Sequence, residues 1–204
     1  MGKQFDLIII GAGPGGYVAA KKAAKLGMSV VIIDKGDVGG TCINRGCIPT
    51  KALVHAAMLY REMTECEKFG LSAEKVGFDL QKIYEYKDLS AARMREELEK
   101  EFKELGVVSV RGTATIQSDK KVRVVTPNKE EEYYYGKHIL IATGARARTI
   151  DIPGLDLPGV MTSEELLTSN ESQYRRLLIL GGGVIGIELA TVFNALGSDV
   201  TIVE

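Results

Sequence analysis

The amino-acid sequence predicts an α/β fold in which parallel β-strands alternate with helices. Two observations indicate this fold: an apolar strand, a glycine-rich loop and a helix follow one another near the start of the chain, and the same pattern returns near its end. In the first copy these are Phe5–Ile10, Gly11–Gly16 and Tyr17–Leu26, with Gly27 as the expected end of the helix. Val30–Ile33, rich in β-branched residues, is the next predicted strand and completes a βαβ unit.

The middle of the chain is predicted to be helical first and rich in short strands afterwards. A helix is expected over residues 50–68, and apolar residues at helical spacing indicate a second one from Asp79, as N-cap, to Leu105. Runs that favour β-structure then predict strands over residues 107–116, 121–126, 132–135 and 137–142, with a turn at 127–128. We therefore expect a β-meander inserted into the domain that begins with the first βαβ unit.

The second copy of the pattern is shorter. Its strand, loop, helix and second strand are predicted at Leu177–Leu180, Gly181–Gly186, Ile187–Leu196 and Val200–Val203. Proline and glycine residues between positions 151 and 159 suggest a linker ahead of it. We therefore expect two domains, 1–150 and 151–204, of which the second is only begun.

Composition excludes several classes of protein. Of the 204 residues, 45% are hydrophobic, which is enough for a core, and 26 basic against 27 acidic side chains give a net charge of −1. This balance argues against nucleic acid or a membrane surface as a partner. The apolar runs are far shorter than the about 20 residues of a membrane span. The start of the chain has no signal-like region, so we expect a cytoplasmic protein.

Each glycine loop has the Gly-x-Gly-x-x-Gly spacing of a dinucleotide-binding loop. Such glycines permit a tight turn, close approach of a pyrophosphate and close packing of helix on strand, with the phosphates at the helix N-terminus. An acid at the end of the following strand is placed to accept hydrogen bonds from a ribose, and in the second unit it favours NAD over NADP. These residues are Gly11, Gly13, Gly16 and Asp34 in the first unit, and Gly181, Gly183, Gly186 and Glu204 in the second.

Cys42 and Cys47 form the most specific motif. On a regular α-helix their Cα atoms would be about 8.7 Å apart, which exceeds the roughly 7 Å that a disulfide allows. The backbone must therefore depart from an ideal helix if the two are bridged, and Gly46 and Pro49 would allow this. If a helix follows, Cys47 lies at its N-terminal end, where the dipole favours a thiolate. A metal site would need two further ligands, which the surrounding sequence lacks. Cys66 is interpreted as a packed thiol.

A family resemblance follows from these motifs together. The segment GGTCINRGCIPTK at residues 39–51, placed between the first glycine loop and GGGVIGIE at residues 181–188, resembles the pyridine nucleotide–disulfide oxidoreductase family and, within it, the dihydrolipoamide dehydrogenases. The resemblance extends over essentially the whole chain. It implies a Rossmann-like FAD-binding domain over residues 1–150 and the start of a Rossmann-like NAD-binding domain over residues 151–204.

The same resemblance implies roles for individual residues. Cys42 and Cys47 would form a redox-active disulfide, with Cys42 exchanging with the substrate and Cys47 facing the flavin. Lys51 and Glu188 would form an ion pair beside the atoms between which hydride passes from flavin to nicotinamide. The further residues expected around the cofactors are Gly40, Thr41, Thr143 and Gly144.

The implied reaction is oxidation of dihydrolipoamide to lipoamide, with electrons passing through the disulfide and FAD to NAD. A lipoyl-bearing protein or small dithiol would be the substrate, and a homodimer is expected of the complete enzyme. The family's histidine base is not recognisable, because His55 and His138 are the only histidines and both are interpreted as structural. We therefore expect this chain alone to be inactive. Glutathione-type or mercuric-type reduction, or a non-catalytic dinucleotide-binding module, are the alternatives.

Overall fold

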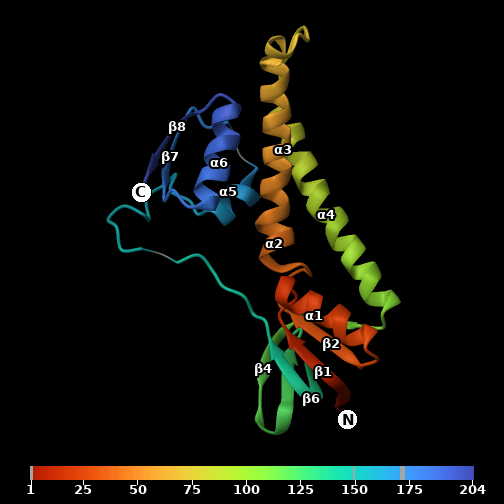
Figure 1. Ribbon diagram of the computed structural model, residues 1–204. Coiled ribbons are helices and arrows are strands. Elements are labelled where there is room, and N and C mark those ends of the chain that lie inside the picture. Colours follow the sequence, from red (N-terminus) through yellow and green to blue (C-terminus); the bar gives the residue numbers. More distant parts are fainter. Residues whose placement is uncertain (1, 149, 171–172) are drawn as a thin grey trace. The chain divides into compact units, whose positions relative to one another are not determined.

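A computed structural model describes residues 2–148, 150–170 and 173–204 (Figure 1). The chain forms two compact units, the first from Met1–Asn44 and Ala92–Arg146, the second from Arg45–Ala91 and Ala147–Glu204. Each is described by itself below. This division follows the packing of the chain, and the proposed division by cofactor at residue 150 stays a prediction.

The first unit is built on one mixed sheet of six strands. Along the chain its elements are β1 (Lys3–Ile10), α1 (Pro14–Lys25), β2 (Val30–Asp34), α2 (Gly40–Arg45), the second part of α4 (Leu80–Glu104), β3 (Val108–Arg111), β4 (Thr113–Ile116), η2 (Ser118–Lys120), β5 (Lys121–Val125) and β6 (Glu131–Ile141). The strand order is β3-β2-β1-β6-β5-β4. β1, β2, β3 and β6 run parallel, whereas β4, β5 and β6 form an antiparallel meander. The predicted α/β fold with an inserted meander is therefore confirmed.

β6 corrects one expectation from the sequence. The strands predicted over residues 132–135 and 137–142 are a single strand that runs through Gly136. The strand continues because both of its edges are paired: Glu131–Tyr135 pairs antiparallel with β5, and Tyr134–Ile141 pairs parallel with β1. The glycine suits this place because a Cβ there would lie 2.8 Å from Cγ1 of Ile8. A glycine within a strand here marks close packing and not a turn.

The core of the first unit lies across the centre of this sheet. Its fully buried members come from β1, β2, β5 and β6 and are Ile8, Val31, Ile33, Val122, Val124 and Tyr134. Ile9 and Ile32, which point to the opposite face, are also fully buried. Burial on both faces explains why β1 and β2 have continuous apolar sequences instead of alternating ones.

The second unit combines helices with a two-stranded parallel sheet. Its elements are α3 (Cys47–Thr64), η1 (Cys66–Phe69), the first part of α4 (Leu80–Glu104), α5 (Ser163–Ser169), β7 (Arg176–Leu180), α6 (Val184–Ala195) and β8 (Asp199–Val203). Side chains of α3, α4, α5 and α6 form one core of Leu53, Ala57, Tyr84, Leu167, Leu189, Val192, Phe193 and Leu196. The predicted second strand–loop–helix–strand pattern is confirmed by β7, α6 and β8.

Helix ends agree with the sequence in part. Asp79 is the predicted N-cap of α4, since its Oδ1 accepts a hydrogen bond from the Lys82 amide at 3.2 Å. Helix α3 begins and ends a few residues before the predicted range, and Cys66 therefore lies in the short 3₁₀ turn η1, where its thiol is buried. Helix α5 was not predicted, although Thr162 and Glu165 form a capping box at its start.

Candidate dinucleotide and disulfide sites

The first glycine loop connects β1 to α1 in the first unit. Gly11 has φ of +107°, and a Cβ there would lie 2.1 Å from the carbonyl oxygen of Ala142, at the end of β6. A Cβ at Gly16 would lie 1.8 Å from the Gly11 carbonyl oxygen. Gly13 is the N-cap of α1, with no side-chain cap on the first-turn amides. The loop thus presents backbone N–H groups at a helix N-terminus, which is the arrangement that binds a pyrophosphate.

Asp34 lies at the carboxyl end of β2, beside this loop. Its Oδ2 accepts a hydrogen bond from the Ala12 amide at 2.6 Å, and its Oδ1 accepts one from the Gly36 amide at 2.9 Å. The carboxylate therefore holds two backbone segments at the carboxyl edge of the sheet. The predicted contact of Asp34 with a ribose stays a prediction.

The second glycine loop, between β7 and α6, repeats this geometry within the second unit. Gly181 has φ of +106°, and Gly183 is an N-cap with φ of −70° and ψ of 178°. A Cβ at Gly186 would lie 2.2 Å from the Gly181 carbonyl oxygen. Oε2 of Glu204 accepts a hydrogen bond from the Gly182 amide, as Asp34 does from Ala12. Both predicted dinucleotide loops therefore have the same backbone form.

Two glycines bring the cysteine segment against the first glycine loop. Gly39 and Gly40 have φ of +100° and +58°, and the Gly39 amide donates to the Ala12 carbonyl at 2.8 Å. A Cβ at Gly40 would lie 2.6 Å from Cα of Gly13. The next residues are Thr41, which is exposed, and Cys42, which is half-buried in α2. Glycine at positions 39 and 40 therefore permits the turn that carries Cys42 to pack on the loop predicted to bind FAD.

The helix breaks between the two cysteines, as the sequence predicted. Gly46 has φ of −143° and ψ of −109°, which ends α2 and starts α3 at Cys47. The first backbone bond of the new helix runs from the Thr50 amide to the Gly46 carbonyl at 3.0 Å. Pro49 lies in the first turn of α3, where proline is tolerated, so Gly46 alone makes the break. Cys47 is exposed and is the first residue of α3.

Lys51 and Glu188 come together within the second unit. Lys51 lies on α3 and Glu188 lies on α6. Oε1 of Glu188 is 3.9 Å from Nζ of Lys51. Both side chains reach solvent, with exposed fractions of 67% and 36%. A pair this open contributes little to stability, because solvent screens it. Its placement beside a flavin stays a prediction.

Thr143 and Gly144 follow the carboxyl end of β6 in the first unit. A Cβ at Gly11 would lie 3.0 Å from Cα of Thr143, so the two segments are in contact. Gly144 has φ of +72° and is exposed. Both predicted residues thus follow the strand end that packs on the first glycine loop, at the edge where ligands of parallel α/β sheets bind.

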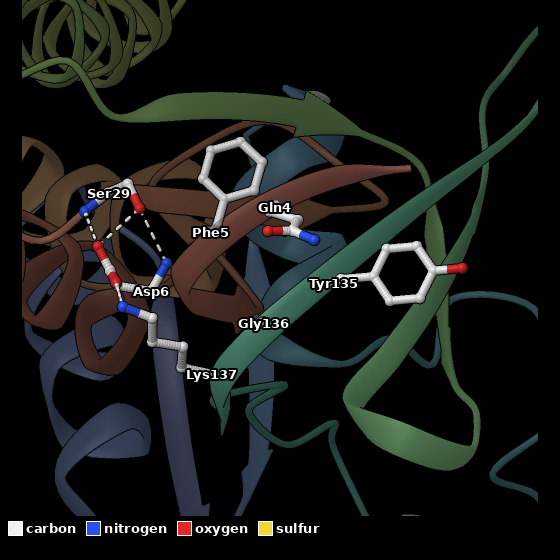
Figure 2. A pocket seen from close by; sticks show the side chains of 7 residues that line it. All are labelled: Gln4, Phe5, Asp6, Ser29, Tyr135, Gly136 and Lys137. Carbon is white, nitrogen blue, oxygen red and sulfur yellow. Dashed lines mark hydrogen bonds and ion pairs between the residues drawn. The ribbon is translucent and has the colours of Figure 1, made fainter. Parts of the chain in front are cut away.

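The hollow in Figure 2 lies at the opposite edge of the sheet. It measures about 430 Å³ and is lined by Gln4, Phe5, Asp6, Ser29, Tyr135, Gly136 and Lys137. The Lys137 ammonium is 2.6 Å from Asp6 and, together with hydrogen bonds from Ser29, holds the pKa of that carboxyl well below its usual range. These groups satisfy one another, so we assign the hollow no part in the chemistry.

Among the residues that the structure describes, no three His, Cys, Asp or Glu side chains gather in a way that could hold a metal ion. None of the helices in those same residues combines the length and the apolar character that crossing a membrane requires.

Comparison with known families decides the assignment. A family model described as pyridine nucleotide-disulphide oxidoreductase matches residues 5–204. The chain belongs to this family. It is 39% identical to the mitochondrial dihydrolipoyl dehydrogenase of Dictyostelium discoideum, over 99% of this chain and 42% of that protein. It is 41% identical to the dihydrolipoyl dehydrogenase of Acholeplasma laidlawii, over 100% of this chain and 60% of that protein.

A solved structure supports the same family fold. The HOCl-induced flavoprotein disulfide reductase RclA from Escherichia coli, solved as a Cu(II) complex, superposes with a TM-score of 0.83 at 34% identity. The match covers 100% of this chain and 43% of that one. The chain thus spans about half the length of the relatives that it matches, and it has the Rossmann-like fold of a flavoprotein disulfide reductase.

Proposed function

We propose that the chain supplies the FAD-binding loop, the redox disulfide and the start of the NAD site of a dihydrolipoamide dehydrogenase. The observation that carries this proposal is the packing of Gly40 on Gly13, which puts the Cys42 turn against the first glycine loop. A dinucleotide loop without adjacent thiols would suit many enzymes, whereas this combination suits one that passes electrons between thiols and a flavin. The relatives named dihydrolipoyl dehydrogenase favour dihydrolipoamide over glutathione or mercuric ion as substrate.

The residues of the first unit fit FAD. The uncapped first turn of α1 offers amides to the pyrophosphate, Gly13 leaves room for it, and Gly16 lets α1 pack closely on the loop. Asp34 is the proposed acceptor for the ribose, and Gly40, Thr41, Thr143 and Gly144 are the further residues that we propose to line the cofactor. When bound, FAD would accept two electrons from the thiols and deliver hydride to a nicotinamide. NAD is the proposed acceptor because Glu204 occupies the position that favours a free 2′-hydroxyl.

The cysteines would act by thiol–disulfide exchange. A thiolate of dihydrolipoamide attacks Sγ of Cys42, which breaks the Cys42–Cys47 bond and leaves Cys47 as a thiolate. The second substrate thiolate then displaces Cys42 from the mixed disulfide, which forms lipoamide and releases a second cysteine thiol. Two protons leave the substrate, and two electrons remain on the cysteine pair. Cys47 is suited to the thiolate role because it begins α3, where the helix dipole stabilises negative charge.

Exchange of this kind needs a base that receives the substrate protons. Neither histidine serves this role in our proposal, since His55 lies within α3 and His138 within β6, and we interpret both as structural. We therefore expect this chain alone not to turn over dihydrolipoamide. The base would come from another part of the complete enzyme, for which we propose a homodimeric, cytoplasmic form acting on a lipoyl-bearing protein or a small dithiol.

The visible absorption spectrum tests the proposal. The purified chain is mixed with FAD, freed of unbound FAD, and recorded before and after anaerobic reduction with a dithiol. We expect a bound-flavin spectrum that gains a long-wavelength charge-transfer band on reduction, because a Cys47 thiolate would lie against the flavin. Cys47→Ser should abolish the band, whereas Cys66→Ser, which removes a buried thiol in η1, should keep it. Bound flavin without a band would contradict the role of Cys47, and absence of bound flavin would contradict the proposed FAD site.

A further inference from the structure

Asn44 lies between the two cysteines and ties α2 to the turn that precedes it. Its Nδ2 donates to the carbonyl oxygens of Gly40 at 2.9 Å, Val38 at 3.1 Å and Asp37 at 3.3 Å. The two hydrogens of one amide nitrogen are thus shared among three carbonyl oxygens of the turn that leads to Cys42. Hydrogen bonds of this local kind fix a backbone that would otherwise take other conformations.

The turn bound by Asn44 also contacts the first glycine loop. Val38 is buried, and the Gly39 amide donates to the Ala12 carbonyl. Gly40 packs on Gly13 closely enough that a Cβ could not be added. Asn44 therefore stabilises the one segment that joins the proposed flavin loop to the Cys42 helix.

Arg95 holds Asn44 in turn. It lies on α4, and its Nη1 donates to Oδ1 of Asn44 at 3.0 Å, across 51 residues of sequence. Arginine is always charged, so this bond is stronger than one between neutral groups. Because Oδ1 accepts from Arg95, the amide of Asn44 is oriented with its nitrogen toward the three carbonyls. The contact is half-buried, which limits competition from water.

We propose that Arg95 is a positioning residue for the redox disulfide, acting through Asn44 on the helix that carries Cys42. This inference rests on the proposed function, because it concerns the same cysteine pair. A thiol held in place loses little freedom when it bonds its partner, so a clamped α2 favours the disulfide over the dithiol. Loosening α2 should therefore make the disulfide easier to reduce.

The test is the equilibrium of the full chain with glutathione buffers. Two glutathione thiols become one glutathione disulfide as the Cys42–Cys47 bond is cleaved to two thiols, and alkylation followed by mass spectrometry measures the ratio. For Arg95→Met we expect the equilibrium constant for the disulfide to fall about tenfold, or about 30 mV for a two-electron couple. Arg95→Lys should recover part of the lost equilibrium constant. Arg93→Met changes an exposed arginine on the same helix and should have the equilibrium constant of the wild type. Asn44→Asp keeps the acceptor for Arg95 but loses the donated bonds to the three carbonyls. It should therefore lower the equilibrium constant for the disulfide, as Arg95→Met does.

Amide hydrogen exchange gives the second readout. Backbone amides of residues 39–45 should exchange faster in Arg95→Met than in Arg93→Met, while those of β1 stay unchanged. Equal equilibria and equal exchange in the two variants would overturn the inference and leave the proposed function standing. If Arg95→Met does not fold, Arg95→Lys and Asn44→Asp decide by the same measurements. A wild-type chain that forms no Cys42–Cys47 disulfide in oxidising buffer would overturn both.

Discussion

Replacing Gly16 with alanine should destabilise the first unit, whereas the same change one residue earlier should not. A Cβ at Gly16 would lie 1.8 Å from the Gly11 carbonyl oxygen and 3.3 Å from Cγ2 of Ile9. A Cβ at Gly15, in the same first turn of α1, would meet Cβ of Ala142 at an ordinary 3.8 Å. The two variants therefore add the same methyl group to the same helix, and only one creates a clash with backbone.

The magnitudes follow from these distances. To relieve the clash, α1 and the glycine loop must separate by about 1 Å, and such overpacking costs about 3 kcal/mol. Gly15→Ala should instead stabilise by about 0.5 kcal/mol, because alanine loses less conformational freedom than glycine in a helix. With a urea dependence of about 2 kcal/mol per molar, Gly16→Ala should lower the unfolding midpoint by about 1.5 M.

Urea unfolding followed by far-UV circular dichroism, without added cofactor, is the assay. The absence of cofactor matters because it separates packing of the helix from binding of the pyrophosphate. Gly186→Ala in the second loop provides a replicate, since its Cβ would lie 2.2 Å from the Gly181 carbonyl oxygen. The reasoning is refuted if Gly16→Ala unfolds at the same urea concentration as Gly15→Ala.

Three further outcomes are expected from the same assay. The folded-state pKa of Asp6 is lowered chiefly by Lys137, so its stabilisation is present above the unfolded pKa of about 3.9 and is lost as pH falls. Lys137→Met should therefore make the midpoint fall less between about pH 6 and pH 3 than in the wild type. The Lys87 side chain is 2% exposed and donates to the Leu167 carbonyl at 2.5 Å. Lys87→Met should therefore lower the free energy of unfolding by about 2 kcal/mol, and an unchanged urea midpoint would contradict this. Glu188→Gln should change stability by less than about 0.5 kcal/mol, and a larger loss would mean that its pair with Lys51 is structural.

The parts of the fold that could be predicted from the sequence are those set by local interactions. The first βαβ unit depends on apolar runs and glycine spacing, and Asp79 caps α4 with its own side chain. The break between Cys42 and Cys47 lies at Gly46, a residue that the sequence offered for a departure from helix geometry. In each case the deciding atoms lie within a few residues of one another.

The features that escaped prediction depend on residues far apart in sequence. Gly136 looked like a strand end, and only the pairing of β6 with β1 and β5 carries the strand through it. Arg95 lies within the helix predicted from Asp79 to Leu105, but its bond to Asn44 joins residues 51 apart in sequence, and no local pattern indicates such a contact. Helix α5 is the exception, because the Thr162–Glu165 capping box was a local signal available in the sequence.

The bond between Asp34 and the Ala12 amide has a consequence for the rate and cost of ligand capture. A loop already fixed by a carboxylate has lost its conformational freedom during folding, so little remains to be lost when a phosphate arrives. Association at the first loop should then proceed without a slow rearrangement. The amide proton of Ala12 should exchange slowly with solvent in the ligand-free chain. Asp34→Ala should make this amide exchange faster while leaving the β1–β2 strand pairing intact.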